Sequence, residues 1–291
     1  MYKVLVLGSR GMLGQMVKII LSRQERFIVK STTHKNTPES FCFDIEYGID
    51  GLRQIMEQQG SFDYIINCIG ILNSSIDEND PNSVRRAELI NALFPHKLAS
   101  LAQEYRARVI QISTDGVFAR NAGVCLEEST CYCNDIYGKT KKIGEVNTPN
   151  YLNLRCSIIG PSPYLRKGLL YWFLSQPRNS EIYGFTDQKW NGVTTLQFAE
   201  LCKILILDNY FDTVYAESPI HHFCPNQSIN KYELLKLFRS YFRPDLTVIP
   251  QINIKKAVSR TLDTNYQSIS VKFGNNIIMK EAIKALTLVM K

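Results

Sequence analysis

The chain has 291 residues, of which 45% are hydrophobic and 21% charged, and 34 basic against 27 acidic side chains give a formal net charge of +7. This composition is typical of a globular protein and excludes a disordered chain, a coiled coil and a collagen-like fibre. Its longest apolar stretches, such as 64–72, are about half of the ~18 residues that a membrane helix needs. The first residues predict a strand rather than a signal peptide. We therefore expect a soluble, cytoplasmic protein of one large domain or two modest ones.

The cysteines, the histidine pair and the excess charge each have more than one interpretation. Cys125, Cys131 and Cys133 lie close in sequence but lack the C-x2-C and H-x3-H spacings of zinc sites, so we interpret the eight cysteines as buried or semi-exposed thiols. His221 and His222 have no third spaced ligand, and we expect no metal. The net charge is either a generic basic surface or a means of attracting anions such as phosphates. No basic run or basic-aromatic stripe indicates nucleic acid.

Apolar runs and helical periodicity alternate along the first half of the chain. Strands are expected at 2–7, 27–31, 64–70, 108–113 and 151–155, and helices after residue 13, at 52–59 and at 83–105. Such alternation predicts a parallel sheet with right-handed crossovers. Beyond about residue 160, prolines separate shorter expected helices at 169–175, 195–207, 231–241 and 279–289. The pattern predicts an α/β fold with a doubly wound parallel sheet and a smaller C-terminal α/β lobe.

Three glycines follow the first expected strand, Gly8, Gly11 and Gly14. In the Rossmann fingerprint the first glycine permits a tight turn, the second lets the backbone approach a pyrophosphate, and the third permits close helix–strand packing. The following helix offers its N-terminal amides and the positive end of its dipole to phosphate. The spacing G-x-x-G-x-x-G differs from the standard G-x-G-x-x-G, but the strand before it and the helix after it predict dinucleotide binding.

The segment after the second strand indicates which dinucleotide binds. A carboxylate there would bind the ribose 2′-hydroxyl and favour NAD. This chain has His34 and Lys35 instead, with Arg10 inside the glycine loop. Cations and hydroxyls are suitable partners for a 2′-phosphate, so we expect NADPH rather than NADH, with an ordinary polar loop as the alternative. Asp44 follows an expected third strand and is placed to accept a hydrogen bond from the adenine amino group.

Candidate catalytic residues lie at the end of a strand and on the helix that follows. Thr114 directly follows the strand 108–113, at the end where open α/β sheets place their ligands. Tyr137 and Lys141 are four residues apart and share a helix face. A nearby ammonium lowers a tyrosine pKa from about 10 and makes the phenol a usable general acid or base. A Y-x-x-x-K pair is frequent by chance, but its combination with the glycine fingerprint and Thr114 predicts a catalytic set.

Blocks over most of the chain carry a more specific resemblance, among them VLGSRGMLGQMV at 6–17, ISTDGVF at 112–118, YGKTKKIGE at 137–145 and DQKWNGVTTLQFAE at 187–200. The chain resembles the extended short-chain dehydrogenase/reductase family, and within it the dTDP-4-dehydrorhamnose reductase-like branch of nucleotide-sugar reductases. The resemblance implies reduction of a 4-keto-6-deoxysugar on a nucleoside diphosphate, with hydride from NADPH. It implies that Tyr137 protonates the carbonyl oxygen, Lys141 holds the nicotinamide ribose and tunes Tyr137, and Thr114 positions the carbonyl.

The expected division of the chain and the expected contacts follow from these motifs and the resemblance. Residues 1–158 are expected to form the NADP-binding Rossmann domain, and 159–291 a substrate-binding lobe interleaved with it. Expected cofactor contacts are Gly8, Ser9, Arg10, Gly11, Met12, Leu13, Gly14, His34, Lys35, Asp44, Ile45, Cys68, Ile69, Gly70, Tyr137 and Lys141. Expected substrate contacts are Thr114, Asp115, Arg155, Trp190 and Asn191. Arg155 is equally suited to pair with an acid, Trp190 to a core or subunit contact, and Asn91 resembles a family position with a structural role.

Gly116 separates related chemistries within the resemblance. The 4,6-dehydratases carry Asp-Glu after the Ser-Thr of the strand, and certain epimerase/reductases carry a cysteine base where Gly116 stands. The rhamnose reductases usually have tyrosine there, so the sugar stays open. A C4 epimerase with retained NAD and a non-catalytic NADP-binding regulatory subunit remain as alternatives. We expect a role in surface polysaccharide biosynthesis, and a homodimer is left open.

Overall fold

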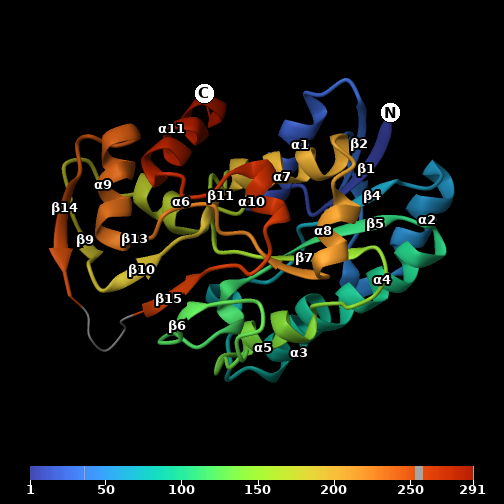
Figure 1. Ribbon diagram of the computed structural model, residues 1–291, viewed down its shortest axis with the longest axis horizontal. Helices are drawn as coiled ribbons and strands as arrows, with labels where there is room; N and C mark the ends of the chain where they lie inside the picture. Colours follow the sequence, from blue (N-terminus) through green and yellow to red (C-terminus); the bar gives the residue numbers. More distant parts are fainter. Residues whose placement is uncertain (36, 253–257, 291) are drawn as a thin grey trace.

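The computed structural model describes residues 1–35, 37–252 and 258–290. Figure 1 shows a central sheet with helices on both faces and a smaller part of the molecule at one end. Over these ranges no helix combines the length and the apolar character needed to cross a bilayer. The architecture therefore has two layers of helices around one sheet, with a second, smaller group of strands and helices beside it.

The large sheet has seven strands in the order β12-β7-β5-β4-β1-β2-β3. Their bounds are β1 Tyr2–Leu7, β2 Phe27–Thr33, β3 Phe41–Cys42, β4 Tyr64–Asn67, β5 Arg108–Ser113, β7 Tyr151–Arg155 and β12 Ile220–His222. Every neighbouring pair is parallel, and the chain winds outward from β1 in both directions. The predicted doubly wound, Rossmann-type parallel sheet is confirmed.

The central strands are mostly buried and rich in apolar residues because both of their faces are covered. Successive side chains of β1 alternate between two hydrophobic clusters: Val4 and Val6 face one, and Leu5 and Leu7 face the other. Helices α1 (Met12–Ser22) and α7 (Thr195–Leu207) contribute to the first cluster, and α2 (Asp50–Gln59) and α4 (Phe94–Glu104) to the second. Figure 1 shows these pairs of helices on opposite sides of the sheet.

The helix expected at 83–105 consists of three segments. These are α3 (Pro81–Ala87), a π-helical segment η3 (Glu88–Leu93) and α4. Pro95 lies in the first turn of α4, where the loss of its backbone N–H costs the least stability. The wider π-helical turn before it accommodates the missing hydrogen bond. Asn91 lies within η3 and is 1% exposed. Hydrophobic periodicity alone does not reveal this change of helix type.

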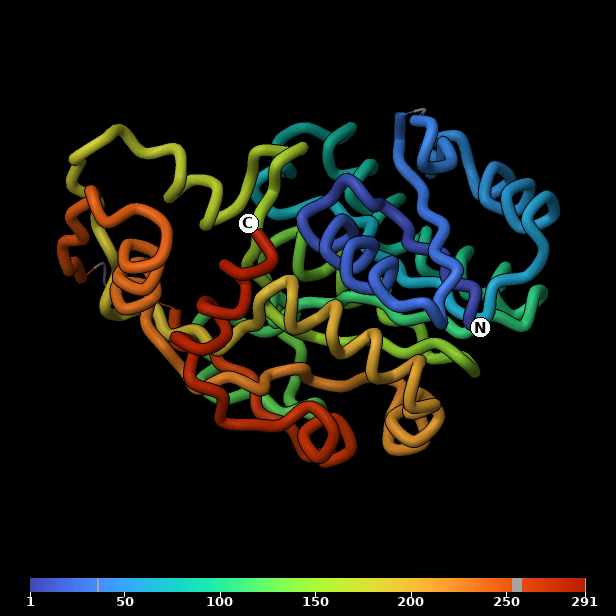
Figure 2. The backbone as a smooth tube through the Cα atoms, turned by 90° about the horizontal axis from the view of Figure 1, so that it is seen from above, coloured from blue at the N-terminus to red at the C-terminus, as the bar shows by residue number. Residues whose placement is uncertain are grey.

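The smaller lobe contains short strands that carry too little alternation to be predicted. A four-stranded sheet has the order β13-β10-β15-β6, from Ile229–Asn230, Gln188–Trp190, Val258–Leu262 and Gly123–Cys125. Two-stranded sheets pair β14 (Thr247–Gln251) with β9 (Glu181–Phe185), and β11 (Val193–Thr194) with β8 (Ile158–Ile159). Helices α6 (Leu169–Leu174), α9 (Lys231–Tyr241) and α11 (Met279–Met290) complete this part. Figure 2 shows α9 and its strands at the end of the molecule away from the N-terminus.

Segments after residue 158 also return to the large sheet. Strand β12 forms its edge next to β7, and α7 packs on α1. Helix α8 (Phe211–Glu217) covers the same face, with Phe211 stacked edge-on against Tyr64 of β4. Helix α10 (Ser268–Phe273) lies nearby. The helices expected at 195–207 and 231–241 are confirmed, whereas the division at residue 158 stays a prediction.

Candidate active site

A short 3-10 helix, η4 (Asp115–Val117), follows β5 and carries the first candidate residue at its start. Thr114 is the N-cap of η4, and its Oγ1 accepts a hydrogen bond from the amide of Gly116 at 3.0 Å. We call residues 114–118 the catalytic turn. Helix α5 (Ile136–Ile143) is capped by Asp135, whose carboxylate accepts from the Gly138 amide at 2.7 Å. The cap begins the helix one residue before Tyr137, so the tyrosine lies in its first turn.

Thr114 and Tyr137 lie together around Gly116. A Cβ built on Gly116 would lie 3.2 Å from both Thr114 Oγ1 and Tyr137 Cε1. A Cβ built on Gly138 would lie only 2.3 Å from the Gly116 carbonyl oxygen, so α5 packs directly on the catalytic turn. The two predicted hydroxyl groups are therefore brought to one place by contacts between backbones.

Lys141 is buried one helical turn after Tyr137. Its Nζ donates to the backbone carbonyl of Ile112 in β5 at 2.7 Å, and burial lowers its pKa to about 8. The sequence predicts that this ammonium lowers the pKa of Tyr137, and the structure contradicts that prediction. Burial raises the pKa of Tyr137 to about 12, and the hydrogen bond with Thr114 offsets only part of this effect. The phenol therefore keeps its proton at neutral pH.

Asn91 connects the loop after β4 to helix α5. Its side chain exchanges two hydrogen bonds with the backbone of Ile71, at 2.9 and 3.0 Å. Its Nδ2 also donates to Thr140 Oγ1 at 3.3 Å, between Tyr137 and Lys141 on α5. These contacts give Asn91 the structural role that the resemblance implies.

The glycine loop, residues 8–14, has the geometry of a phosphate cradle. Gly8 has φ +76°, and a Cβ there would lie 3.0 Å from Ile69 Cγ1 in the loop after β4. A Cβ on Gly14 would lie 2.3 Å from the Gly8 carbonyl oxygen. Gly11 caps α1 without a side chain that binds the first helical amides. These amides and the helix dipole suit a pyrophosphate, so the loop fits a dinucleotide.

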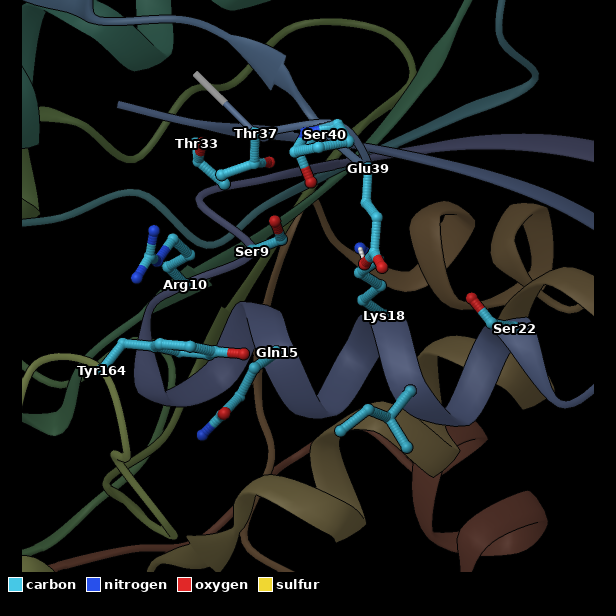
Figure 3. Close-up of a pocket in the computed structure, with 12 residues that line it drawn as sticks. Ser9, Arg10, Gln15, Lys18, Ser22, Thr33, Thr37, Glu39, Ser40 and Tyr164 are labelled. Carbon is cyan, nitrogen blue, oxygen red and sulfur yellow. Dashed lines mark ion pairs between the residues drawn. The ribbon is translucent and has the colours of Figure 1, made fainter. Parts of the chain in front are cut away.

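A cavity of about 490 Å³ lies between the start of α1 and the segment after β2. Its lining residues are Ser9, Arg10, Gln15, Lys18, Ile19, Ser22, Thr33, Thr37, Pro38, Glu39, Ser40 and Tyr164. The Arg10 guanidinium lies 4.6 Å from the centre of the Tyr164 ring, and Lys18 forms an ion pair with Glu39 at 3.5 Å (Figure 3). Hydroxyl groups and two cations thus adjoin the glycine loop, a set suited to a phosphate group.

The predicted cofactor residues divide between this region and its surroundings. His34 and Lys35 are exposed and lie outside the lining of the cavity, whereas Arg10 is part of it. Asp44 accepts from the Glu46 amide at 3.0 Å as the cap of a 3-10 helix, η1 (Ile45–Tyr47). Cys68, Ile69 and Gly70 form the loop that passes from Gly8 to Asn91. Thr33, Ser40 and Tyr164 were not predicted: Thr33 directly precedes the predicted His34, whereas only the fold brings Ser40 and Tyr164 to α1.

The predicted substrate residues have partners within the protein. For Arg155 the sequence allows a substrate contact or an ion pair, and the structure shows the ion pair: the guanidinium is 1% exposed and binds both Glu145 oxygens at 2.7 and 2.8 Å. Trp190 Nε1 donates to Ser157 Oγ at 2.7 Å. Asn191 exchanges hydrogen bonds at 2.6 and 3.0 Å with the backbone of Leu262. Contacts of these residues with a substrate stay predictions.

Glu145 is the centre of a buried polar network that sequence reasoning missed. Besides binding Arg155, the Glu145 carboxylate accepts a hydrogen bond from Ser113 Oγ at 2.8 Å, and Ser113 directly precedes Thr114. The pKa of Glu145 is lowered although burial acts in the opposite direction. His222 Nε2 lies 3.3 Å from Arg155 Nη1, and because arginine only donates, this histidine is neutral and accepts. All eight cysteines are free thiols, and no group of three or more potential ligands able to hold a metal ion occurs among the described residues.

Comparisons with known proteins agree with this geometry. The family model described as RmlD substrate binding domain matches residues 2–255. A dTDP-4-dehydrorhamnose reductase from Clostridium acetobutylicum is 19% identical over 99% of both chains, with a TM-score of 0.77. Another from Bacillus anthracis, in complex with NADP, is 19% identical over 100% of both chains, with a TM-score of 0.78. The Helicobacter pylori ADP-L-glycero-D-manno-heptose-6-epimerase is 14% identical over 99% of this chain and 96% of its own, with a TM-score of 0.76. No curated protein sequence matches the chain.

Proposed function

The chain belongs to the family described as RmlD substrate binding domain, and on this premise we propose that it is an NADPH-dependent oxidoreductase of nucleotide sugars. The proposed reaction reduces the C4 keto group of a nucleoside-diphosphate 4-keto-6-deoxysugar. The observation that carries the proposal is the placement of Tyr137 beside Thr114, with Lys141 one turn further along the same helix. A role in surface polysaccharide biosynthesis and a cytoplasmic location belong to the same proposal.

The residues of the glycine loop and its cavity suit NADPH. The pyrophosphate would bind the free amides at the start of α1, and Arg10, Ser9 and Ser40 would hold the 2′-phosphate. The structural neighbour from Bacillus anthracis, which was solved with NADP, supports this choice. When bound, the cofactor supplies the hydride for reduction of the keto group.

The side chains of the catalytic turn and α5 would donate the proton and orient the carbonyl group. Because burial raises the pKa of Tyr137 to about 12, the phenol is protonated at neutral pH, which is the form that a reduction requires of its general acid. Thr114 Oγ1, fixed by the Gly116 amide, would orient the carbonyl oxygen toward the phenol. Lys141, with a pKa of about 8, retains most of its positive charge at pH 7 and stabilises charge developing on oxygen.

The decisive experiment is turnover of a panel of dTDP- and UDP-4-keto-6-deoxysugars, followed by the loss of NADPH absorbance. Tyr137→Phe removes the proton donor, so kcat falls by ~10²–10⁴-fold while NADPH binding is retained. Tyr132→Phe, at a tyrosine that is 66% exposed, is the matched control and keeps full activity. Unchanged turnover in Tyr137→Phe would refute the proposed chemistry.

Two other outcomes of this experiment correspond to the alternatives. Interconversion of C4 stereoisomers without net NADPH consumption indicates an epimerase. Tight NADPH binding with no turnover on any keto sugar indicates a regulatory subunit. Product analysis by NMR then identifies the sugar and the configuration at C4 for a reductase.

A further inference from the structure

One charged side chain of the small lobe, that of Arg260, contacts the catalytic turn. Arg260 lies on β15, whose neighbours are β6 on one side and β10 on the other. Its Nε lies 3.2 Å from Asp115 Oδ2, and its Nη1 donates to the Phe118 carbonyl oxygen at 2.8 Å. The Arg260 and Asp115 side chains are only 16% and 15% exposed, so this ion pair is far better shielded from solvent than a surface pair.

The two contacts of Arg260 involve residues near the start and at the end of the catalytic turn. Asp115 is the first residue of η4, and Phe118 is the residue that follows it. Thr114 Oγ1 also lies 3.3 Å from the second Asp115 oxygen, Oδ1. The guanidinium, the carboxylate and the Thr114 hydroxyl therefore form one connected series of polar contacts.

The catalytic turn also packs on α5, with little free space between them. The Gly116 carbonyl lies against Gly138, where even a methyl group would not fit. The turn is thus held both by Arg260 and by the helix that carries Tyr137. A shift of the turn changes the distance between Thr114 and Tyr137, because Gly116 adjoins both residues and their side chains are hydrogen-bonded to each other.

We propose that Arg260 is a positioning residue that aligns Thr114 with Tyr137 by clamping the catalytic turn to the substrate lobe. This inference rests on the proposed reductase function. Strand β15 pairs with β10, which carries Trp190, and Asn191 binds the backbone of Leu262 at the end of β15. Segments expected to contact the sugar nucleotide are therefore joined to the catalytic hydroxyl groups through a single strand.

The ion pair also affects the charge around Tyr137. The Asp115 carboxylate raises the pKa of the phenol, as do Asp135 and Cys156, and Arg260 lies against the first of these groups. Without Arg260, the Asp115 carboxylate loses its partner in a mostly shielded position. We therefore expect the pKa of Tyr137 to rise further in a variant that lacks the Arg260 charge, so that the phenol stays protonated and a lower kcat reports geometry.

The test is the steady-state kinetics of Arg260→Gln with NADPH and the keto sugar that the unsubstituted protein reduces. We expect kcat and kcat/KM to fall together by about 10- to 100-fold, because a misplacement of about 1 Å has an effect of this size. The Kd for NADPH stays unchanged. Arg243→Gln, at an ion pair with a similarly shielded arginine (18% exposed) remote from the catalytic turn, is the matched control and keeps its kcat.

Two further variants separate geometry from charge. Arg260→Lys keeps the charge but cannot make both contacts of the guanidinium, so we expect an intermediate kcat. Arg260→Gln combined with Asp115→Asn also removes the charge of the unpaired carboxylate, but it does not restore kcat. An unchanged kcat in Arg260→Gln, or a rise in KM alone, would overturn the positioning role, since the latter indicates plain substrate binding.

A readout without turnover distinguishes this inference from the function on which it rests. If the unsubstituted protein reduces no keto sugar, the proposed function fails and hydrogen exchange decides the role of Arg260. Amides of residues 114–118 then exchange at least tenfold faster in Arg260→Gln and Arg260→Lys than in Arg243→Gln. Equal protection in all three proteins would show that Arg260 does not hold the turn.

Discussion

The glycine loop and the catalytic turn follow parallel strands of one sheet but are held in different ways. The glycine loop is shaped mainly by backbone contacts: Gly14 packs on the Gly8 carbonyl within a seven-residue segment. In addition, the Ser9 amide donates to the Thr32 carbonyl of the neighbouring strand β2. The catalytic turn is held by side chains from distant parts of the chain, among them Arg260. Backbone contacts within the loop and with the adjacent strand shape the proposed phosphate cradle, whereas the proposed alignment of two hydroxyl groups also depends on side chains from distant parts of the chain.

The largest expected effect comes from breaking the network beneath the catalytic turn. Glu145→Gln leaves Arg155 buried without its counter-ion, and we expect the free energy of unfolding to fall by about 3–5 kcal/mol. Glu233→Gln, which removes a half-exposed pair with Lys236, changes it by less than about 1 kcal/mol. Urea unfolding of both variants measures the difference. Similar changes in the free energy of unfolding of the two variants would mean that the Glu145 ion pair does not hold the region beneath the catalytic turn.

The next effect breaks the glycine loop through its backbone. In Gly14→Ala the new Cβ meets the Gly8 carbonyl, so we expect a loss of about 1–3 kcal/mol in stability and weaker NADPH binding. Gly51→Ala is the matched change in another helix. Its Cβ would lie 3.6 Å from the nearest atom, on Phe43, and there we expect a gain of about 0.5–1 kcal/mol. Thermal unfolding and cofactor titration compare the two, and equal effects would exclude a special role for Gly14.

A smaller effect tests which cation binds the 2′-phosphate of NADPH. Arg10→Ala removes a cation from the cavity, and we expect about tenfold weaker NADPH binding with NADH binding unchanged, as for the loss of one charge-assisted bond. Lys35 was predicted from sequence but lies outside the cavity lining, so Lys35→Ala serves as the comparison. Fluorescence titration measures both. If Lys35→Ala weakens NADPH binding more than Arg10→Ala does, the 2′-phosphate binds near Lys35, as the sequence predicts, and not in the cavity.

The smallest effect concerns pH and should separate the two regions. Burial lowers the pKa values of His221 and His222 below the ordinary 6.5, so the unfolded chain binds more protons than the folded one as pH falls below that value. Stability is therefore complete above about pH 6.5 and declines as the pH falls toward the folded-state pKa values. We expect hydrogen exchange at pH 5 to accelerate around β12 and to stay constant in the glycine loop. His222→Gln reduces the acceleration.

Residues close together in sequence predicted much of the site. The glycine spacing after an apolar strand and the four-residue interval from Tyr137 to Lys141 are local patterns. The structure places the glycine loop at the carboxyl end of β1 and packs α5 on the turn that follows β5. Other predictions from local pattern were incomplete. The helix expected at 83–105 contains a π-helical segment, and the pKa of Tyr137 is raised rather than lowered, because burial outweighs nearby charge.

By itself, the sequence determined the parallel sheet, the phosphate cradle and the candidate pair on α5, because each depends on periodicity or spacing within a few residues. Only the tertiary structure decided which groups surround them. Arg260 reaches Asp115 across 145 positions of sequence, and Arg155, for which the sequence allowed a substrate contact or an ion pair, binds the buried Glu145. Burial and partner choice arise when distant segments pack together, and no spacing within one segment encodes them.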